Sequence, residues 1–95
     1  MIDLRHLQTF CAVTEANSFT LAAIRLGCSQ PTVSTHIQLL ESELGARLFK
    51  RSRFTRDVAL TETGEQTLIY SRKLLRLAQR APSMIRRRAS QESKS

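Results

Sequence analysis

Short polar side chains without charge line one side of a helix that the sequence predicts over residues 30–44. Gln30 and Gln38 each carry a hydrogen-bond donor and an acceptor on one amide, while Ser34 and Thr35 carry hydroxyls. A helix advances about 100° per residue, so these side chains share one face and apolar residues fall opposite. Such a face can read the hydrogen-bonding groups on base edges in the major groove of duplex DNA. The opposite, core-facing side holds Val33, Ile37, Leu40 and Leu44.

The start of this helix carries residue types that fit the groove. The amide of Gln30 matches N6 and N7 of adenine, and Pro31 can lie against a thymine methyl group. Ser29 is the predicted N-cap, where free N–H groups favour a phosphate. Ser34 and Thr35 are short enough to reach phosphates or base edges. The alternative for each residue is an ordinary solvated surface. The candidate DNA contacts on this helix are Ser29, Gln30, Pro31, Thr32, Ser34, Thr35 and Gln38.

Positive charge is concentrated after this helix. The 95 residues carry a net charge of +7. Residues 1–46 hold two Arg against four acidic residues, whereas residues 47–95 hold thirteen Lys and Arg against four. Arg51, Arg53 and Arg56 are candidates for contacts to phosphates or the minor groove. The asymmetry favours an anionic partner, either nucleic acid or an acidic membrane surface; the alternative is a basic face that only aids solubility.

Two helices are expected before the polar one. The first runs over residues 4–16, with Asp3 as its N-cap. Ser18 or Thr20 caps a short second helix, which Gly27 ends because glycine tolerates the left-handed conformation. The predicted apolar stripe of the first helix consists of Leu4, Leu7, Phe10, Cys11 and Thr14.

A basic hairpin is expected after Gly45 ends the third helix. Residues 47–51 and 57–60 alternate polar and apolar side chains, which predicts two strands with a cationic tip over 52–56. A two-stranded hairpin is not stable alone, so it must lean on the helices. The apolar residues available for this are Leu48, Val58 and Leu60.

A long last helix follows. Thr61 is its predicted cap, and the helix runs from Glu62 to about Ala81, where Pro82 should end or kink it. A rod about 30 Å long cannot bury its apolar stripe against so small a domain. A partner helix is the natural solution. The residues expected to pack against it are Leu68, Leu74, Leu75 and Ala78.

Other classes of protein are disfavoured. No run of about 18 apolar residues predicts a membrane span, and no apolar segment of a secretory signal follows the first residue, so we expect a cytoplasmic protein without membrane contact. Cys11 and Cys28 lack zinc-site spacing and are expected to stay reduced. His6 is expected at the surface and His36 at the rim of the core. Paired carboxylates, an activated nucleophile, a metal cluster and a phosphate loop are all missing, so we expect no enzyme, metal or cofactor.

Several motifs occur together in a fixed order, which a known family shares. They are Phe19-Thr20-Leu21-Ala22-Ala23-Ile24-Arg25-Leu26, Ser29-Gln30-Pro31-Thr32-Val33-Ser34, Ile37, Leu40-Glu41, Leu44-Gly45, Leu48-Phe49, Arg51, and Leu60-Thr61 followed by Gly64. In this combination the chain resembles the LysR-type transcriptional regulators over residues 3–80. The resemblance implies a mainly α fold: a winged helix-turn-helix of three helices and a two-stranded wing, followed by a long linker helix. It also implies homodimers through antiparallel linker helices, tetramers in full-length members, and binding to interrupted inverted repeats.

The family's positions carry over residue by residue, with departures. The resemblance assigns the wing arginine to Arg53 or Arg56. The stretch between Arg51 and Leu60 is longer than usual in the family, and Thr35 stands where many members carry Arg. The family's DNA-contacting positions on the third helix correspond to Ser29, Gln30, Pro31, Ser34 and Thr35.

We therefore expect three parts: a winged helix-turn-helix DNA-binding domain over 1–60, a linker and dimerisation helix over 61–82, and a flexible basic tail over 83–95. Family members carry a further domain that binds a small-molecule inducer, and we expect this chain to be a DNA-binding fragment or short member without it. The expected function is sequence-specific binding of double-stranded promoter DNA for transcriptional regulation. The alternative is a winged-helix module for protein contacts or nonspecific nucleic-acid contacts.

Overall fold

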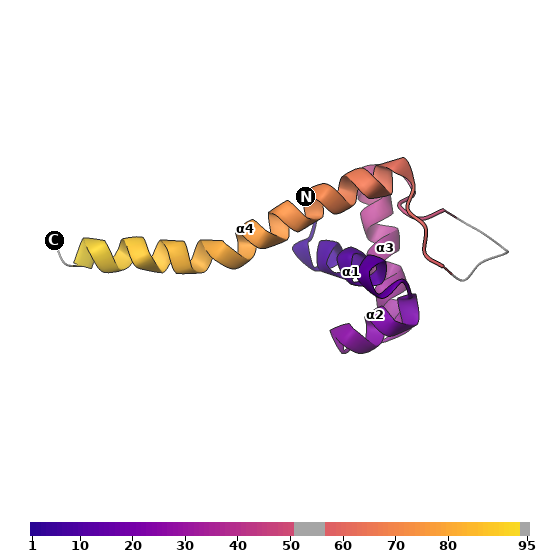
Figure 1. Ribbon diagram of the computed structural model, residues 1–95, viewed down its shortest axis with the longest axis horizontal. Helices are drawn as coiled ribbons and strands as arrows, with labels where there is room; N and C mark the ends of the chain where they lie inside the picture. The colour runs from indigo at the N-terminus through magenta and orange to yellow at the C-terminus, as the bar shows by residue number, and fades with distance from the viewer. Residues whose placement is uncertain (51–56, 94–95) are drawn as a thin grey trace.

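Helices account for most of the computed structural model, which describes residues 1–50 and 57–93 (Figure 1). Three of them pack together, and the last leaves this unit as a rod, so the molecule measures 63 × 26 × 19 Å. The predicted mainly helical architecture is confirmed. The helices are α1 (Leu4–Ala16), α2 (Phe19–Leu26), α3 (Gln30–Leu44) and α4 (Glu62–Ser93).

Capping groups set the helix boundaries. Oδ1 of Asp3 accepts a hydrogen bond from the backbone N–H of Arg5 at 2.8 Å, as expected of the N-cap of α1. The Arg5 side chain also donates to this carboxylate, which lowers the pKa of Asp3 to about 2 and keeps the cap charged. Ser18 caps α2, accepting from the N–H of Leu21 at 3.0 Å. Gly27 ends α2 in the left-handed conformation with φ 69°.

An apolar core holds α1, α2 and α3 together. Ala22 and Ala23 are buried on α2, and their small size lets the neighbouring helices approach closely. The ring of Phe49 lies against those of Phe10 and Phe19, at centroid distances of 5.4 and 5.5 Å. This contact ties the segment after α3 to the first two helices. The core consists of Leu7, Phe10, Val13, Ala22, Ala23, Val33, Ile37, Leu40 and Leu48.

Two predicted core residues lie outside the core. Leu4 is 45% exposed and Leu44 is 37% exposed. Leu4 lies about one helical turn before the first core residue of α1, Leu7, and Leu44 lies about one turn after the last core residue of α3, Leu40. Short helices that cross one another bury only their middle turns, so the helical spacing was right but the extent of the core was overestimated.

The base of the wing pairs antiparallel. Phe49 and Leu60 form an antiparallel bridge, and the N–H of Lys50 donates to the carbonyl of Ala59 at 2.8 Å. In the described residues the two predicted strands are thus represented by this bridge. The predicted hairpin tip at 52–56 lies outside the described residues.

Asn17 connects the wing to the end of α1. Its backbone adopts the left-handed conformation with φ 51°. Its side-chain Oδ1 accepts from the N–H of Val58 at 2.7 Å, and its Nδ2 donates to Oδ1 of Asp57 at 3.0 Å. Val58 and Leu60 are partly buried against the helical core, as predicted for a hairpin that cannot stand alone.

The start of α4 is joined to the segment after α3. Oγ1 of Thr61 accepts from the N–H of Gly64 at 2.9 Å, which confirms Thr61 as the cap. The same hydroxyl donates to the carbonyl of Arg47 at 2.6 Å. The N–H of Thr61 donates to the carbonyl of Leu48 at 3.0 Å. These bonds fix where α4 leaves the domain.

The helix α4 does not end before Pro82. It continues to Ser93, so the predicted end of the helix near Ala81 is wrong. Pro82 removes one helical N–H, but the surrounding side chains are exposed and water can satisfy the freed carbonyl of Ala78. The residues that follow include Met, Arg and Ala, which favour helix.

Candidate nucleic-acid interface

The first turn of α3 is built from hydroxyl groups. Ser29 is the N-cap, as predicted, and its Oγ accepts from the N–H of Thr32 at 3.2 Å. Oγ of Ser29 and Oγ1 of Thr32 also lie 2.8 Å apart, within hydrogen-bonding distance. Pro31 occupies the first turn, where its missing N–H removes no helical hydrogen bond. The turn is therefore well fixed, and it presents the positive end of the helix dipole to solvent.

Gln30 is exposed and held from a neighbouring helix. Its side-chain Oε1 accepts a hydrogen bond from the hydroxyl of Thr20, on α2, at 3.2 Å. No partner for Nε2 of Gln30 lies among the described residues. The amide therefore enters any interface with both of its N–H donors available.

The rest of the polar face lies as the helical spacing predicts. Pro31, Thr35 and Gln38 are exposed, and Ser34 is half-buried. The opposite side of α3 is core. No Lys or Arg occurs between Gln30 and the end of the helix, so the face is polar without positive charge. The structure thus brings the predicted α3 residues together on one surface.

A cleft of about 430 Å³ lies between this face and the base of the wing. Two exposed cations, Arg47 and Lys50, line it together with Gln38. A carboxylate oxygen of Glu41 accepts from the N–H of Leu48 at 2.8 Å, which fixes the wing base to α3. Arg47 and Lys50 lie in the predicted basic hairpin but were not among the candidate DNA contacts. Their position next to the cationic tip of that hairpin could have indicated this role.

The predicted wing arginines Arg51, Arg53 and Arg56 lie outside the described residues. The structure describes both ends of the segment that carries them. At these ends, the N–H of Lys50 donates to the carbonyl of Ala59.

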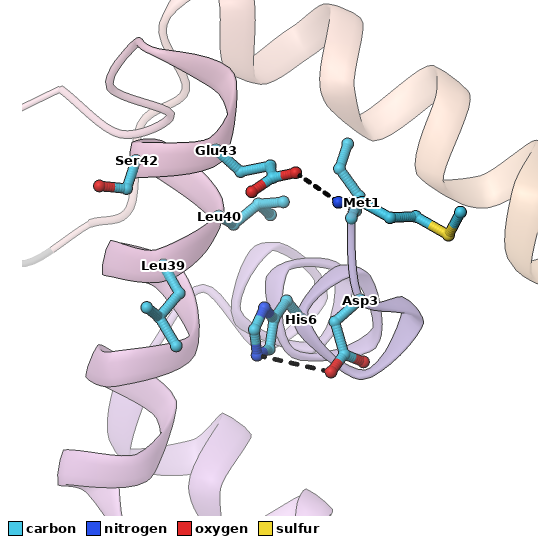
Figure 2. Close-up of a pocket in the computed structure, with 8 residues that line it drawn as sticks. Met1, Asp3, His6, Leu39, Leu40, Ser42 and Glu43 are labelled. Carbon is cyan, nitrogen blue, oxygen red and sulfur yellow. Dashed lines mark ion pairs between the residues drawn. The ribbon is translucent and has the colours of Figure 1, made fainter.

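A pair of histidines joins α1 to α3 near this face. His6 was expected at the surface, but its side chain is only 17% exposed. Its ring packs against that of His36 at an interplanar angle of 38°, with 4.8 Å between the ring centroids. The prediction was wrong because α3 crosses α1 at this turn. Nδ1 of His36 lies 2.7 Å from Oγ1 of Thr9. Figure 2 shows His6 facing Asp3, with 4.0 Å between nitrogen and oxygen. Burial, then the charges of His6 and Arg5, lower the pKa of His36.

The predicted dimerisation residues of α4 divide into two groups. Leu68 and Leu75 are partly buried and pack against the core of their own domain. Leu74 and Ala78 are exposed. Leu68 and Leu75 therefore contribute to the packing of the single chain, whereas Leu74 and Ala78 are open to solvent.

An apolar seam that includes Leu74 runs along α4 and is exposed except at the half-buried Ala81. Its members recur at alternating spacings of four and three residues, the spacing of a coiled-coil interface. Leu77 is 63% exposed in this seam. An apolar groove of about 330 Å³ adjoins it, lined by Ile2, Leu7 and Leu44 among others. The α4 seam consists of Tyr70, Leu74, Leu77, Ala81 and Met84.

Two other kinds of site are missing from the part of the chain that the structure describes. None of the helices in residues 1–50 and 57–93 is long and apolar enough to span a membrane. In the same residues, no three His, Cys, Asp or Glu side chains gather in a way that could hold a metal ion. Cys11 and Cys28 are free thiols, and burial, followed by the charge of Glu15, raises the pKa of Cys11. Cys11 is buried, as predicted.

Comparison with known proteins decides the family. The family model described as bacterial regulatory helix-turn-helix protein, lysR family, matches residues 4–65. The chain belongs to the LysR family. Its relatives are named as transcriptional regulators rather than enzymes, in agreement with the expected absence of catalysis.

Relatives and solved structures agree with this LysR assignment. The uncharacterized HTH-type transcriptional regulator YnfL of Escherichia coli K12 is 45% identical over 86 residues, which cover 90% of this chain and 28% of YnfL. A crystal structure of the DNA-binding domain of BenM with catB site 1 DNA has a TM-score of 0.84 and 44% identity, covering 93% of this chain and 96% of that one. The DNA complex of the CbnR DNA-binding domain has a TM-score of 0.85 and 39% identity, with 92% and 98% covered. The chain thus spans less than a third of the length of YnfL.

Proposed function

We propose that this chain binds double-stranded DNA sequence-specifically to regulate transcription, with α3 in the major groove and the basic wing at the flanking minor groove and phosphates. The observation that carries the proposal is the uncharged polar face of α3, with the exposed amide of Gln30 at its start. The major groove is about 12 Å wide and admits an α-helix. Support comes from the BenM and CbnR domains, which share this fold and were solved with DNA.

Affinity and specificity come from different parts of this interface. Contacts to phosphates position a protein without reading sequence, and they make binding depend on salt. Arg47 and Lys50 at the cleft are placed for such contacts, beside the predicted wing arginines Arg51, Arg53 and Arg56. The neutral face of α3, which starts at Gln30, contacts the base edges.

The chain acts as a homodimer on an interrupted inverted repeat in this proposal. The α4 seam leaves Leu74 and Leu77 exposed to water, and a second α4 packed against it would bury both. Burial of one leucine side chain contributes about 1.5–3 kcal/mol. Two copies related by a twofold axis present two α3 helices, which requires two half-sites of opposite orientation.

A second candidate function is binding of nucleic acid irrespective of sequence. It is favoured by the charge of α4, where residues 66–91 carry seven Lys and Arg and no Asp or Glu. Such a rod attracts any polyanion. It predicts equal affinity for all duplexes, whereas the first function predicts discrimination.

Selection from a pool of random duplexes, followed by sequencing, tests the proposed function. Wild-type protein should enrich a defined half-site, whereas an unenriched pool would favour the second candidate. Gln30→Ala should then lower affinity for the enriched duplex by about 1–3 kcal/mol and relax the preference at one base pair. Gln8→Ala, an exposed glutamine on α1, is the matched control and should leave both unchanged.

A further inference from the structure

The hydroxyl of Thr20 is the one group from outside α3 that holds Gln30 among the described residues. The distance from Oγ1 of Thr20 to Oε1 of Gln30 is 3.2 Å, and both side chains are exposed. Thr20 is not needed to cap α2, because Ser18 fills that role through the N–H of Leu21. The hydrogen bond therefore joins the two helices of the helix-turn-helix at the surface that faces the proposed groove.

Thr20 has little conformational freedom as the donor of this hydrogen bond. It lies in the first turn of α2, and the same helix is locked into the core by Ala22 and Ala23, which are 0% and 4% exposed. A β-branched side chain such as threonine has few χ1 rotamers. The packing of α2 thus fixes the backbone that carries Thr20, and the restricted χ1 of threonine limits where its hydroxyl can lie.

The bond restrains Gln30 without using up its recognition groups. An amide oxygen has two lone pairs, and an amide nitrogen has two N–H donors. Thr20 occupies one lone pair, so one acceptor and both donors remain. Adenine needs one donor toward N7 and one acceptor for N6–H, and the restrained amide still offers this pair.

We propose that Thr20 is a positioning residue for base recognition, holding the Gln30 amide in the orientation that reads a purine edge. This inference rests on the proposed function and assigns it a specificity-determining residue on α2. Immobilising a flexible side chain opposes binding, and a side chain already restrained in the free protein avoids much of that cost. Loss of the restraint should therefore reduce discrimination about three- to tenfold at the base pair that Gln30 reads.

Thr20→Val and Thr20→Ser separate this role from others. Valine keeps the shape and removes the hydroxyl, while serine keeps the hydroxyl. Affinities are measured for the selected duplex and for single base-pair variants of it, and circular dichroism confirms that each variant is folded. Thr20→Val should reduce discrimination about three- to tenfold only at the base pair that Gln30 contacts, and the salt dependence of binding should stay unchanged. Thr20→Ser should retain it, and in the Gln30→Ala background Thr20→Val should change nothing.

Other outcomes overturn the inference. If Thr20→Val weakens binding to every duplex equally, and does so also in the Gln30→Ala background, Thr20 contacts the phosphate backbone directly. If Thr20→Val matches wild type on all duplexes, the hydrogen bond has no role in recognition. In both cases wild-type discrimination, and with it the proposed function, would stand. Wild-type protein that binds all duplexes equally would refute the proposed function, and the inference with it.

Discussion

Gly64 is the position where the junction between wing and α4 is most sensitive to a single added carbon. It is buried in the first turn of α4, and its N–H donates to the Thr61 hydroxyl. A Cβ at this position would lie well inside van der Waals contact with the carbonyl oxygen of Leu48, and 3.1 Å from Cδ2 of Leu60. The obstacle is backbone, so Gly64→Ala must displace α4 from the wing base.

The expected loss follows from opposing contributions. Overpacking of a tight site costs about 1–3 kcal/mol and sometimes more. Displacing α4 also strains the hydrogen bond from the N–H of Thr61 to the carbonyl of Leu48, worth about 1 kcal/mol. Alanine regains about 1 kcal/mol of helix propensity. Because the obstacle is backbone, the overpacking cost lies at the upper end of its range, while the other two contributions cancel. We therefore expect Gly64→Ala to lower the free energy of unfolding by about 3 kcal/mol.

Thermal unfolding followed by circular dichroism measures this effect. A loss of this size lowers the midpoint by about 12–24 °C for a domain of this length. Gly27→Ala is the matched control, because Gly27 has φ 69° and nothing lies within 4 Å of the place that a Cβ would take, which leaves backbone strain alone. That strain costs about 1–2 kcal/mol. A Gly64→Ala protein at least as stable as Gly27→Ala would refute the argument from the close approach.

Three further predictions concern the seam, the histidine pair and the cleft. Leu74→Asp combined with Leu77→Asp should yield folded monomers by light scattering, because both side chains are exposed in the single chain; a variant still dimeric would exclude the α4 seam as the interface. The free energy of unfolding should fall as the pH drops below about 6.5, the ordinary pKa of histidine, because His36 binds a proton more readily in the unfolded chain than in the folded one. Urea unfolding at several pH values should show a smaller dependence of this free energy on pH for His36→Gln than for wild type. An equal dependence for the two proteins would contradict this role of His36. Lys50→Gln should weaken binding to all duplexes alike and reduce the slope of log K against log salt by about 0.9, whereas a change in base preference would argue against a phosphate contact.

Features fixed by local chemistry were predictable from the sequence. The caps at Asp3, Ser29 and Thr61 depend on a side chain and the next turn of backbone, so residue type and spacing suffice. The two-sided character of α3 was predictable for the same reason. The family was also recognisable, because its motifs recur at fixed spacing.

Features that depend on contacts between distant residues were not predictable. The side chain of Asn17 accepts a hydrogen bond from the N–H of Val58, 41 residues away, and no local pattern indicates this contact. Thr20 competed with Ser18 as a cap, and only the crossing of α2 and α3 shows that it bonds Gln30 instead. The length of α4 was missed because Pro82 was given more weight than the helix formers after it.

The proposed contact between the amide of Gln30 and a purine edge in the major groove can be tested by substitution of single base atoms. Each purine of the selected duplex is replaced in turn by its 7-deaza analogue, which removes the N7 acceptor while keeping the base pair. Fluorescence anisotropy then gives the affinity of wild-type protein and of Gln30→Ala. We expect one purine at which the replacement weakens the binding of wild-type protein about fivefold and leaves the binding of Gln30→Ala unaffected. Equal responses of the two proteins at every purine would contradict it.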